Sequence, residues 1–177
     1  NGIKYLLNEK VSTVNPDAKE IVTSSGRVEN YDKLVLATGS YPFVPPIPGN
    51  EKEFCHVYRT IEDLDEIERS SKESKVGVVI GGGLLGLEAA NAIKNLGLET
   101  HVVEFAPRLM AVQLDQDGGD LLRRKIEALG VTVHTEKATT EIIDGNECRY
   151  RMNFADGTHI DTDMIVFSAG IRPQDEL

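Results

Sequence analysis

A glycine-rich turn between residues 81 and 86 carries the clearest chemical signal in this sequence. The turn reads Gly81, Gly82, Gly83, Leu84, Leu85 and Gly86, follows the apolar run 76–80 and precedes the helical pattern 84–96. Gly81 permits a tight turn, Gly83 lets an anion approach the backbone N–H groups of a helix N-terminus, and Gly86 allows close helix–sheet packing. In this strand–turn–helix context, the spacing predicts a site for the pyrophosphate of a dinucleotide.

An acidic residue, Glu104, ends the next expected strand, 21 residues after Gly83. In dinucleotide-binding units an acid about 20 residues further on binds the ribose hydroxyls. Because its charge would repel a 2′-phosphate, Glu104 predicts NADH in preference to NADPH. Arg108 keeps NADPH open, since it could reach a 2′-phosphate or stack on the adenine. Glu88, early in the same helix as Leu84, has either a site role or only a favourable interaction with the helix dipole.

Composition and charge exclude several other kinds of site. The net charge of −10 argues against a nucleic-acid partner, and no apolar run is long enough for a membrane helix. Cys55 and Cys148 form neither a Cys-x-x-Cys motif nor a ligand pair, and the four histidines are scattered, so no metal site is expected. The acidic run 62–68 and the basic run 123–125 are interpreted as solvated surface. Two ordinary thiols fit a reducing cytoplasm.

The elements that must position the turn alternate between strand and helix. Strands are expected at 76–80, 100–104, 131–134 and 141–143, and a hairpin at 149–154 and 158–160. Helices are expected at 84–96, closed by Gly97, and around Leu122, Ile126 and Leu129, ended by Gly130. This order predicts an α/β fold, a Rossmann-like domain with a parallel sheet and β-hairpin additions.

The first forty residues follow a different pattern. Strands are expected at 11–14, 20–23 and 27–29, with a hairpin turn at 24–26, and a strand buried on both faces at 34–37. Four prolines between residues 42 and 48 predict a stiff connector and a domain boundary. The start at Asn1, without an initiator Met, indicates a piece of a longer protein.

One internal repeat spans the two patterns with an offset of 131 residues. Gly26, Asp32, 34–36, Gly39 and Pro42 recur as Gly157, Asp163, 165–167, Gly170 and Pro173. Each copy has a hairpin turn, an apolar strand, a glycine turn and a proline. The repeat brackets the Rossmann-like region, as expected if the chain crosses between two domains once in each direction.

These motifs resemble the flavin-dependent pyridine-nucleotide oxidoreductases over essentially the whole chain. The resemblance also rests on Ala37-Thr38-Gly39-Ser40 and Ser168-Ala169-Gly170-Ile171-Arg172-Pro173. Within that family the chain is most similar to the large subunits of bacterial NAD(P)H nitrite reductases. The segments 31–42, 58–64, 81–90, 104–110, 113–116 and 123–127 carry this closer similarity.

The resemblance implies an FAD domain interrupted by an inserted NADH domain. The expected division is a partial FAD-binding segment at 1–42, the NADH-binding domain at 43–162 and a return segment at 163–177. Glu88 and Gly170 then lie near the nicotinamide, and Thr38 and Gly39 belong with the flavin. The family's FAD-binding glycine turn and its Gly-Asp segment are absent, so the FAD pocket is incomplete here and the chain alone should be inactive.

In the whole enzyme, the resemblance implies hydride transfer from NADH to FAD and reduction of nitrite to ammonia. Sirohaem and an iron–sulfur cluster are expected only outside this chain, because no residues here could ligate them. The partners implied are NADH and the rest of the reductase, with a homodimer left open. Three alternatives remain: a fragment of a rubredoxin reductase, a fragment of an NADH oxidase, or a stand-alone nucleotide-binding module. No residue of this chain is expected to act as a catalytic acid or nucleophile.

Overall fold

The computed structural model describes residues 2–177, and they belong to two compact units. The small unit comprises the residues up to Ser40 together with Pro173–Leu177, and the large unit comprises Tyr41–Arg172. The chain therefore passes between the units twice, as the internal repeat predicts. Among the described residues, no helix has the length and apolar character needed to cross a membrane.

The small unit contains an antiparallel sheet with the strand order β1-β2-β3. The strands are β1 (Val11–Asn15), β2 (Glu20–Thr23) and β3 (Val28–Asn30). The Asn15 side chain accepts a hydrogen bond from the Ala18 N–H at 3.1 Å and thereby closes the first turn. Gly26, with φ of +82°, stands in the second turn, so the predicted hairpin is confirmed.

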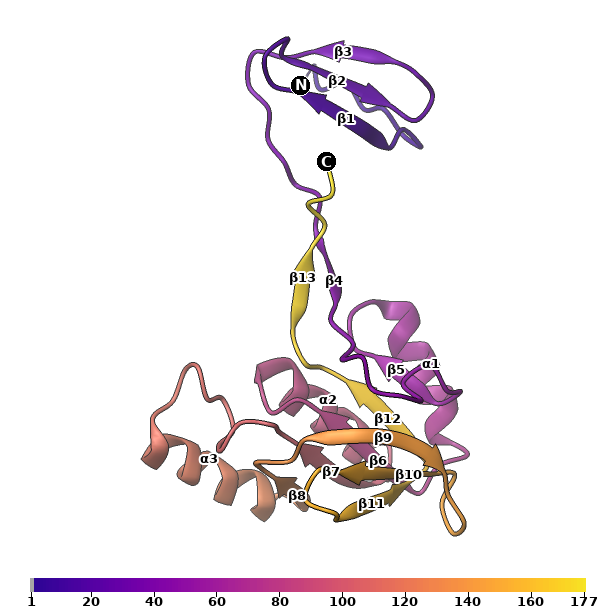
Figure 1. The fold of residues 1–177 in the computed structure, drawn as a ribbon, viewed down its shortest axis with the longest axis vertical. Coiled ribbons are helices and arrows are strands. Elements are labelled where there is room, and N and C mark those ends of the chain that lie inside the picture. Colours follow the sequence, from indigo (N-terminus) through magenta and orange to yellow (C-terminus); the bar gives the residue numbers. More distant parts are fainter. Residues whose placement is uncertain (1) are drawn as a thin grey trace. The chain divides into compact units, whose positions relative to one another are not determined.

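A five-stranded parallel sheet forms the centre of the large unit, with the order β5-β12-β6-β7-β8 (Figure 1). The strands are β5 (Cys55–Val57), β12 (Met164–Phe167), β6 (Val76–Ile80), β7 (Glu99–Val103) and β8 (Val131–His134). Together with the helices between them, these strands confirm the predicted parallel α/β fold.

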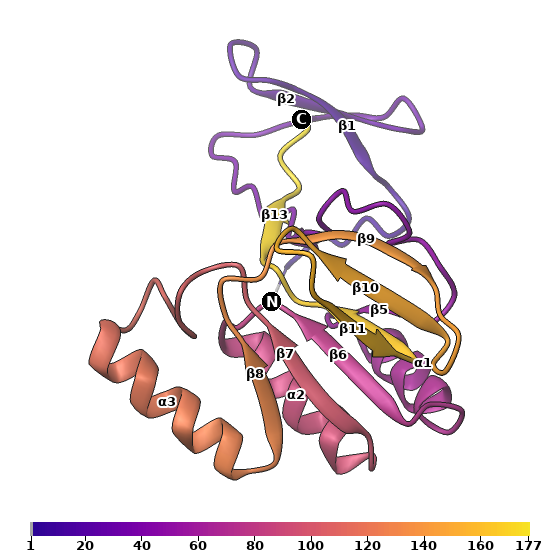
Figure 2. The ribbon, with the colours of Figure 1, turned by 60° about the horizontal axis from the view of Figure 1, so that its bottom comes forward.

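Each face of the central sheet is covered by a different layer (Figure 2). The helices α1 (Ile61–Ser71), α2 (Leu84–Asn95) and α3 (Gln116–Ala128) pack on one face, where Val79, Val102 and Val166 are completely buried. The opposite face packs on the antiparallel sheet of β9 (Thr139–Asp144), β10 (Tyr150–Phe154) and β11 (His159–Thr162). Burial on both faces explains why β6 and β12, two neighbouring strands of this sheet, contain no polar side chain.

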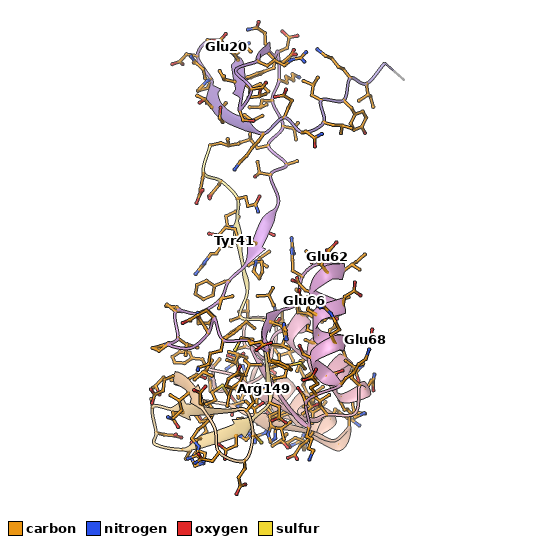
Figure 3. The ribbon with its side chains drawn as sticks, turned by 90° about the vertical axis from the view of Figure 1, so that its right-hand side faces the viewer. Glu20, Tyr41, Glu62, Glu66, Glu68 and Arg149 are labelled. Carbon is orange, nitrogen blue, oxygen red and sulfur yellow. The ribbon has the colours of Figure 1, made fainter. Side chains whose placement is uncertain are left out.

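The acidic run on α1 is a solvated face, as predicted. Figure 3 shows Glu62, Glu66 and Glu68 along this helix, and all three are exposed. Asp63 instead belongs to the capping box at the helix N-terminus, where its carboxylate accepts the Thr60 N–H at 2.7 Å. The two cysteines are free thiols, and burial raises the pKa of Cys55 to about 11.

The boundaries of the large unit differ from the predicted division at 42–43 and 162–163. The unit extends to Arg172 because β12 pairs in parallel with both β5 and β6. The crossings of the chain are formed by β4 (Ser40–Pro42) and β13 (Ile171–Pro173), which pair with each other. β4 ends the first copy of the internal repeat and β13 ends the second copy, so the two copies pair through their last strands.

The prediction of a buried strand at residues 34–37 is wrong. These residues form no strand, and Val35 and Leu36 are 85% and 64% exposed. Their repeat counterparts Val166 and Phe167 are 0% and 2% exposed, because β5 and β6 flank β12. An apolar run becomes a buried strand only where neighbouring strands satisfy its backbone, and no described strand pairs with 34–37.

Gly81 connects β6 to α2 in a conformation that side chains rarely adopt. Its φ is +121°, and a Cβ built there would lie 2.2 Å from the carbonyl oxygen of Ser168. Gly83 has φ of −82°, and no atom lies within 4 Å of a Cβ built at that position. Only the first of these two glycines is required by the fold itself.

We expect Gly81→Ala to lower the free energy of unfolding by about 2–4 kcal/mol, because backbone strain and overpacking act together. Gly83→Ala is the matched control and should cost about 1 kcal/mol or less, the usual difference at a helix N-cap. Urea denaturation followed by circular dichroism measures both. Equal losses in the two variants would contradict this account of the turn.

A pair of histidines makes stability depend on pH. His101 Nδ1 lies 3.0 Å from His134 Nε2, and burial followed by the positive charges of His101 and Lys137 lowers the pKa of His134. Burial also lowers the pKa of His56. Because the unfolded chain protonates first, this stability is complete above the unfolded histidine pKa of about 6.5 and is lost as pH falls through the folded value.

The melting temperature should therefore fall as the pH is lowered from about 7 to about 5.5, and His134→Gln should make this dependence shallower. The introduced amide keeps a polar group beside His101 but does not titrate. His159→Gln, which removes an imidazole at an exposed position on β11, is the control and should change the slope less than His134→Gln does. If the melting temperature of the His134 variant depended on pH as steeply as that of the unsubstituted chain, His134 would not be a source of the pH dependence.

Candidate functional site

The carboxyl ends of the five parallel strands meet along one edge of the central sheet. Pairing aligns the strand ends Val57, Phe167, Ile80, Val103 and His134 in that order. The segments that follow these strands therefore emerge next to one another. The order of strands changes direction at β6, with β7 and β8 on one side and β12 and β5 on the other. In open α/β sheets, ligands bind at such switch points.

A cavity of about 760 Å³ lies along this edge, lined by residues of the large unit alone. Most of its wall is apolar, and the charged residues that line it are Arg59, Glu104 and Lys137. From the connector come Pro42, Phe43, Pro45 and Ile47, and after the strand ends come Tyr58, Gly81, Gly83, Leu84, Leu85, Phe105, Ala106, Ser168, Ala169, Gly170 and Ile171. The volume is in the range of small-molecule and cofactor sites.

The glycine turn places the N-terminus of α2 against this cavity. The Gly81 N–H donates to the Val103 carbonyl at 2.8 Å, so the turn continues the hydrogen bonding of the sheet. Gly83 is the N-cap of α2, and no side chain caps the helix. The first N–H groups of a helix lack intrahelical acceptors and carry partial positive charge. The arrangement therefore suits an anionic group bound at Gly83.

Glu104 connects the turn to the segment after β7. Its Oε2 accepts the Gly82 N–H at 2.6 Å and its Oε1 accepts the Ala106 N–H at 2.7 Å. An ionised carboxylate has about four acceptor sites, so each oxygen retains capacity for a further donor. Glu104 thus lines the cavity in a fixed orientation with acceptors available.

Arg108 holds the loop that follows, rather than lining the cavity itself. Its Nε donates to the Leu114 carbonyl at 2.9 Å and its Nη2 to the Ala111 carbonyl at 3.2 Å. The Met110 N–H donates to the Gly82 carbonyl at 2.9 Å. These bonds connect the loop to the glycine turn, and Met110 and Ala111 line the cavity.

Lys137 is, with Arg59, one of the two cations in the cavity lining, and it lies on the side near Glu104. Its N–H donates to the Glu104 carbonyl at 3.1 Å, so the two residues are neighbours. Its ammonium group binds the carboxylate of Asp156 and the hydroxyl of Thr158. Lys137 therefore supports the wall while its charge is matched by an acid.

The structure places half of the cofactor-binding residues predicted from the sequence in the cavity lining. Gly81, Gly83, Leu84, Leu85, Glu104 and Gly170 line the cavity. Gly82 and Gly86 are buried beneath it, Arg108 supports the loop, and Glu88 is exposed on α2 away from the lining. Thr38 and Gly39 belong to the small unit.

Three lining residues were not predicted from the sequence as site residues: Tyr58, Arg59 and Lys137. The reason is that β5, with only three residues, was not predicted as a strand. Had it been placed beside β12, Tyr58 and Arg59 would have followed a carboxyl end at the edge of the sheet. Lys137 lies beyond β8 and carries no motif, so only the folded chain shows that it lines the cavity.

Comparisons with known proteins agree with this geometry. Residues 1–177 match the family model described as pyridine nucleotide-disulphide oxidoreductase. The chain is 60% identical, over 178 aligned residues, to the NADH nitrite reductase large subunit of Escherichia coli (strain K12), covering all of this chain and 21% of that protein. It spans about a fifth of the length of the curated nitrite reductases that it matches.

Two solved structures share the fold. A ferredoxin reductase from Rhodopseudomonas palustris superposes with a TM-score of 0.86 at 26% identity, covering 96% of this chain and 42% of that one. A water-forming NADH oxidase from Lactobacillus brevis, determined with bound NADH, superposes with a TM-score of 0.82 at 26% identity, covering 94% of this chain and 38% of the oxidase.

Glu104→Ala should loosen the glycine turn even without any ligand, because two backbone N–H groups lose their acceptor. We expect hydrogen exchange at the Gly82 and Ala106 amides to accelerate about ten-fold, which corresponds to about 1.4 kcal/mol for the lost charged hydrogen bonds. Heteronuclear NMR measures exchange at each amide. Glu62→Ala, on the exposed face of α1, should leave both amides unchanged. Unaltered exchange in the Glu104 variant would show that the carboxylate does not support the turn.

Proposed function

Since the chain belongs to the pyridine nucleotide-disulphide oxidoreductase family, we propose that its large unit binds NADH in the cavity at the carboxyl edge of the central sheet. In the whole enzyme, this unit presents NADH to an FAD for the reduction of nitrite to ammonia. The 60% identity to a nitrite reductase large subunit over the full length of this chain supports the choice of parent enzyme.

The observation that carries the proposal is the uncapped N-terminus of α2 in a cavity wall. No side chain caps the helix, and the space above Gly83 is open. A pyrophosphate placed there accepts hydrogen bonds from N–H groups that have no other partner in the helix, and it is stabilised by the helix dipole. The residues present therefore fit the phosphate portion of a dinucleotide.

Glu104 selects the nucleotide in this proposal. Each of its oxygens accepts one backbone N–H and can accept a ribose hydroxyl as well. The same carboxylate repels the additional phosphate of NADPH, which favours NADH. Arg108 contributes indirectly, because its bonds to Leu114 and Ala111 hold the loop beside Glu104. Glu88 remains a proposed neighbour of the nicotinamide on resemblance alone.

The chemistry that NADH supplies when bound is hydride donation, and this chain supplies orientation. Gly170 and Ile171, after β12, line the end of the cavity that lies across β6 from Glu104 in strand order. We propose that this end holds the nicotinamide. Thr38 and Gly39 are proposed to contact the flavin in the whole enzyme.

The complete reaction also needs cofactors for which the described residues offer no complete binding site. FAD needs its own pyrophosphate turn, and among residues 2–177 the one G-x-G-x-x-G turn is that of Gly81. No group of three or more metal-ligating side chains occurs among the described residues, so they do not fit sirohaem or an iron–sulfur cluster. We propose that the rest of the parent enzyme binds these groups.

An NADH oxidase is the second candidate for the parent enzyme. The structural similarity to an oxidase determined with NADH favours the same nucleotide site with a different electron acceptor. The parent gene discriminates between them: clustered cysteines downstream support the nitrite reductase, and their absence supports the oxidase.

Gly83→Val tests the nucleotide site. The unsubstituted chain should bind NADH, and the variant should lose at least about ten-fold in affinity, equivalent to about 1.4 kcal/mol, because the added methyl groups occupy the space proposed for the pyrophosphate. Isothermal titration calorimetry gives the affinities, and circular dichroism verifies folding. Ala128→Val, at an exposed position of α3, is the matched control. Undiminished affinity in the folded Gly83 variant would show that phosphate binds elsewhere.

A further inference from the structure

We propose that Asp156, in the turn between β10 and β11, is a further determinant of nucleotide choice, because it neutralises a lysine that would otherwise attract the 2′-phosphate of NADPH. The inference rests on the NADH site proposed above and deepens it. Asp156 lies outside the cavity lining and acts through Lys137, which belongs to the lining. It is therefore a positioning residue rather than a residue that contacts the nucleotide.

Lys137 is the lining cation on the adenosine side of the proposed site. It follows β8, which pairs with β7, and its N–H donates to the carbonyl of Glu104 at 3.1 Å. Arg59, the other lining cation, follows β5, on the opposite side of β6. In the proposed site Glu104 binds the adenosine ribose, which in NADPH carries the additional phosphate. That phosphate would therefore lie on the Lys137 side of the cavity.

The ammonium group of Lys137 is held by the turn between β10 and β11. It donates to the carboxylate of Asp156 and, at 2.8 Å, to the hydroxyl of Thr158, and it lies 5.4 Å from the centre of the Phe154 ring. The lysine side chain is only 20% exposed, so water and salt screen this ion pair less than a fully exposed one. The structure thus directs the ammonium to the protein itself.

Asp156 is fixed in the position that binds the lysine. Its Oδ1 accepts the N–H of Thr158 at 3.0 Å and the hydroxyl of Thr158 at 2.6 Å, while its Oδ2 accepts the ammonium of Lys137. The Ala155 N–H donates to the Ala138 carbonyl at 2.9 Å, which connects the turn to the chain beside Lys137. Lys137, followed by Thr158, lowers the pKa of Asp156, so the carboxylate is charged at neutral pH.

The charges on this side of the cavity favour a ribose without a phosphate. The pair of Lys137 and Asp156 carries no net charge, so it does not offset the repulsion between Glu104 and a 2′-phosphate. Arg108, the other cation that the sequence offered for this phosphate, donates instead to two carbonyls of its own loop. Without the charge of Asp156, the flexible lysine stem would let the ammonium bind a phosphate oxygen.

Asp156→Asn should raise the affinity for NADPH about ten-fold, the usual effect of gaining one charged hydrogen-bonding partner. The affinity for NADH, which lacks the 2′-phosphate, should change less, so the ratio of the two affinities shifts toward NADPH. Isothermal titration calorimetry, with NADPH added directly or used to displace NADH, gives this ratio, and circular dichroism verifies folding. The shift should shrink as ionic strength rises. Adding Lys137→Met to Asp156→Asn should abolish it.

Asp144→Asn is the matched control, because it removes the same charge from another lysine–aspartate pair of the same antiparallel sheet. Asp144 binds Lys52 at 2.7 Å, and Lys52 is not part of the cavity lining. This variant should leave the ratio of affinities unchanged. An equal shift in it would mean that overall charge, rather than the neutralisation of Lys137, sets the ratio, and the inference would be wrong.

Two further outcomes would also overturn the inference while leaving the proposed function in place. One is NADH binding by Asp156→Asn with no gain in NADPH affinity, and the other is a gain that persists when Lys137→Met is added. Failure of the unsubstituted chain to bind NADH would instead overturn the proposed function, and this inference with it.

Discussion

The hydrogen-bond ladder of the parallel sheet is the interaction on which the rest of the large unit depends. The ladder continues beyond the strands, since Gly81, Ser168 and Glu104 each donate a backbone N–H to the strand beside them. Parallel pairing brings carboxyl ends to a common edge, so segments from distant parts of the sequence meet there. Glycine at position 81 allows the segments after β6 and β12 to lie this close, because a Cβ there would collide with the Ser168 carbonyl.

The charge around the cavity differs from the charge of the whole chain. The chain carries a net charge of −10, and much of the acidic surface on α1 faces solvent. The cavity instead combines an uncapped helix N-terminus with two cations, Arg59 and Lys137, and one acid, Glu104. Short-range hydrogen bonds and dipoles in a partly enclosed site outweigh distant charges that water and salt screen. A net negative charge that argues against nucleic acid as a partner therefore does not argue against a nucleotide.

The internal repeat shows how one sequence pattern acquires two environments. Gly26 and Gly157 stand in hairpin turns with nearly the same φ, +82° and +81°. The apolar runs that follow diverge, because the second is flanked by β5 and β6 and the first has no described partner strand. Hydrophobic pattern specifies a tendency toward burial, and burial itself requires partners that the pattern does not contain.

The sequence by itself determined most of the local elements and the position of the glycine turn between β6 and α2. Periodicity, Gly97 and Gly130 identified α2 and α3, and glycine spacing with Glu104 identified the turn, because these signals depend on backbone conformation and short-range contacts. Only the tertiary structure decided that β12 completes the central sheet, that Arg108 supports a loop and that Arg59 and Lys137 line the cavity. Those placements depend on pairing between segments far apart in sequence. Such pairing is selected by the total packing of the sheet, which no local pattern encodes.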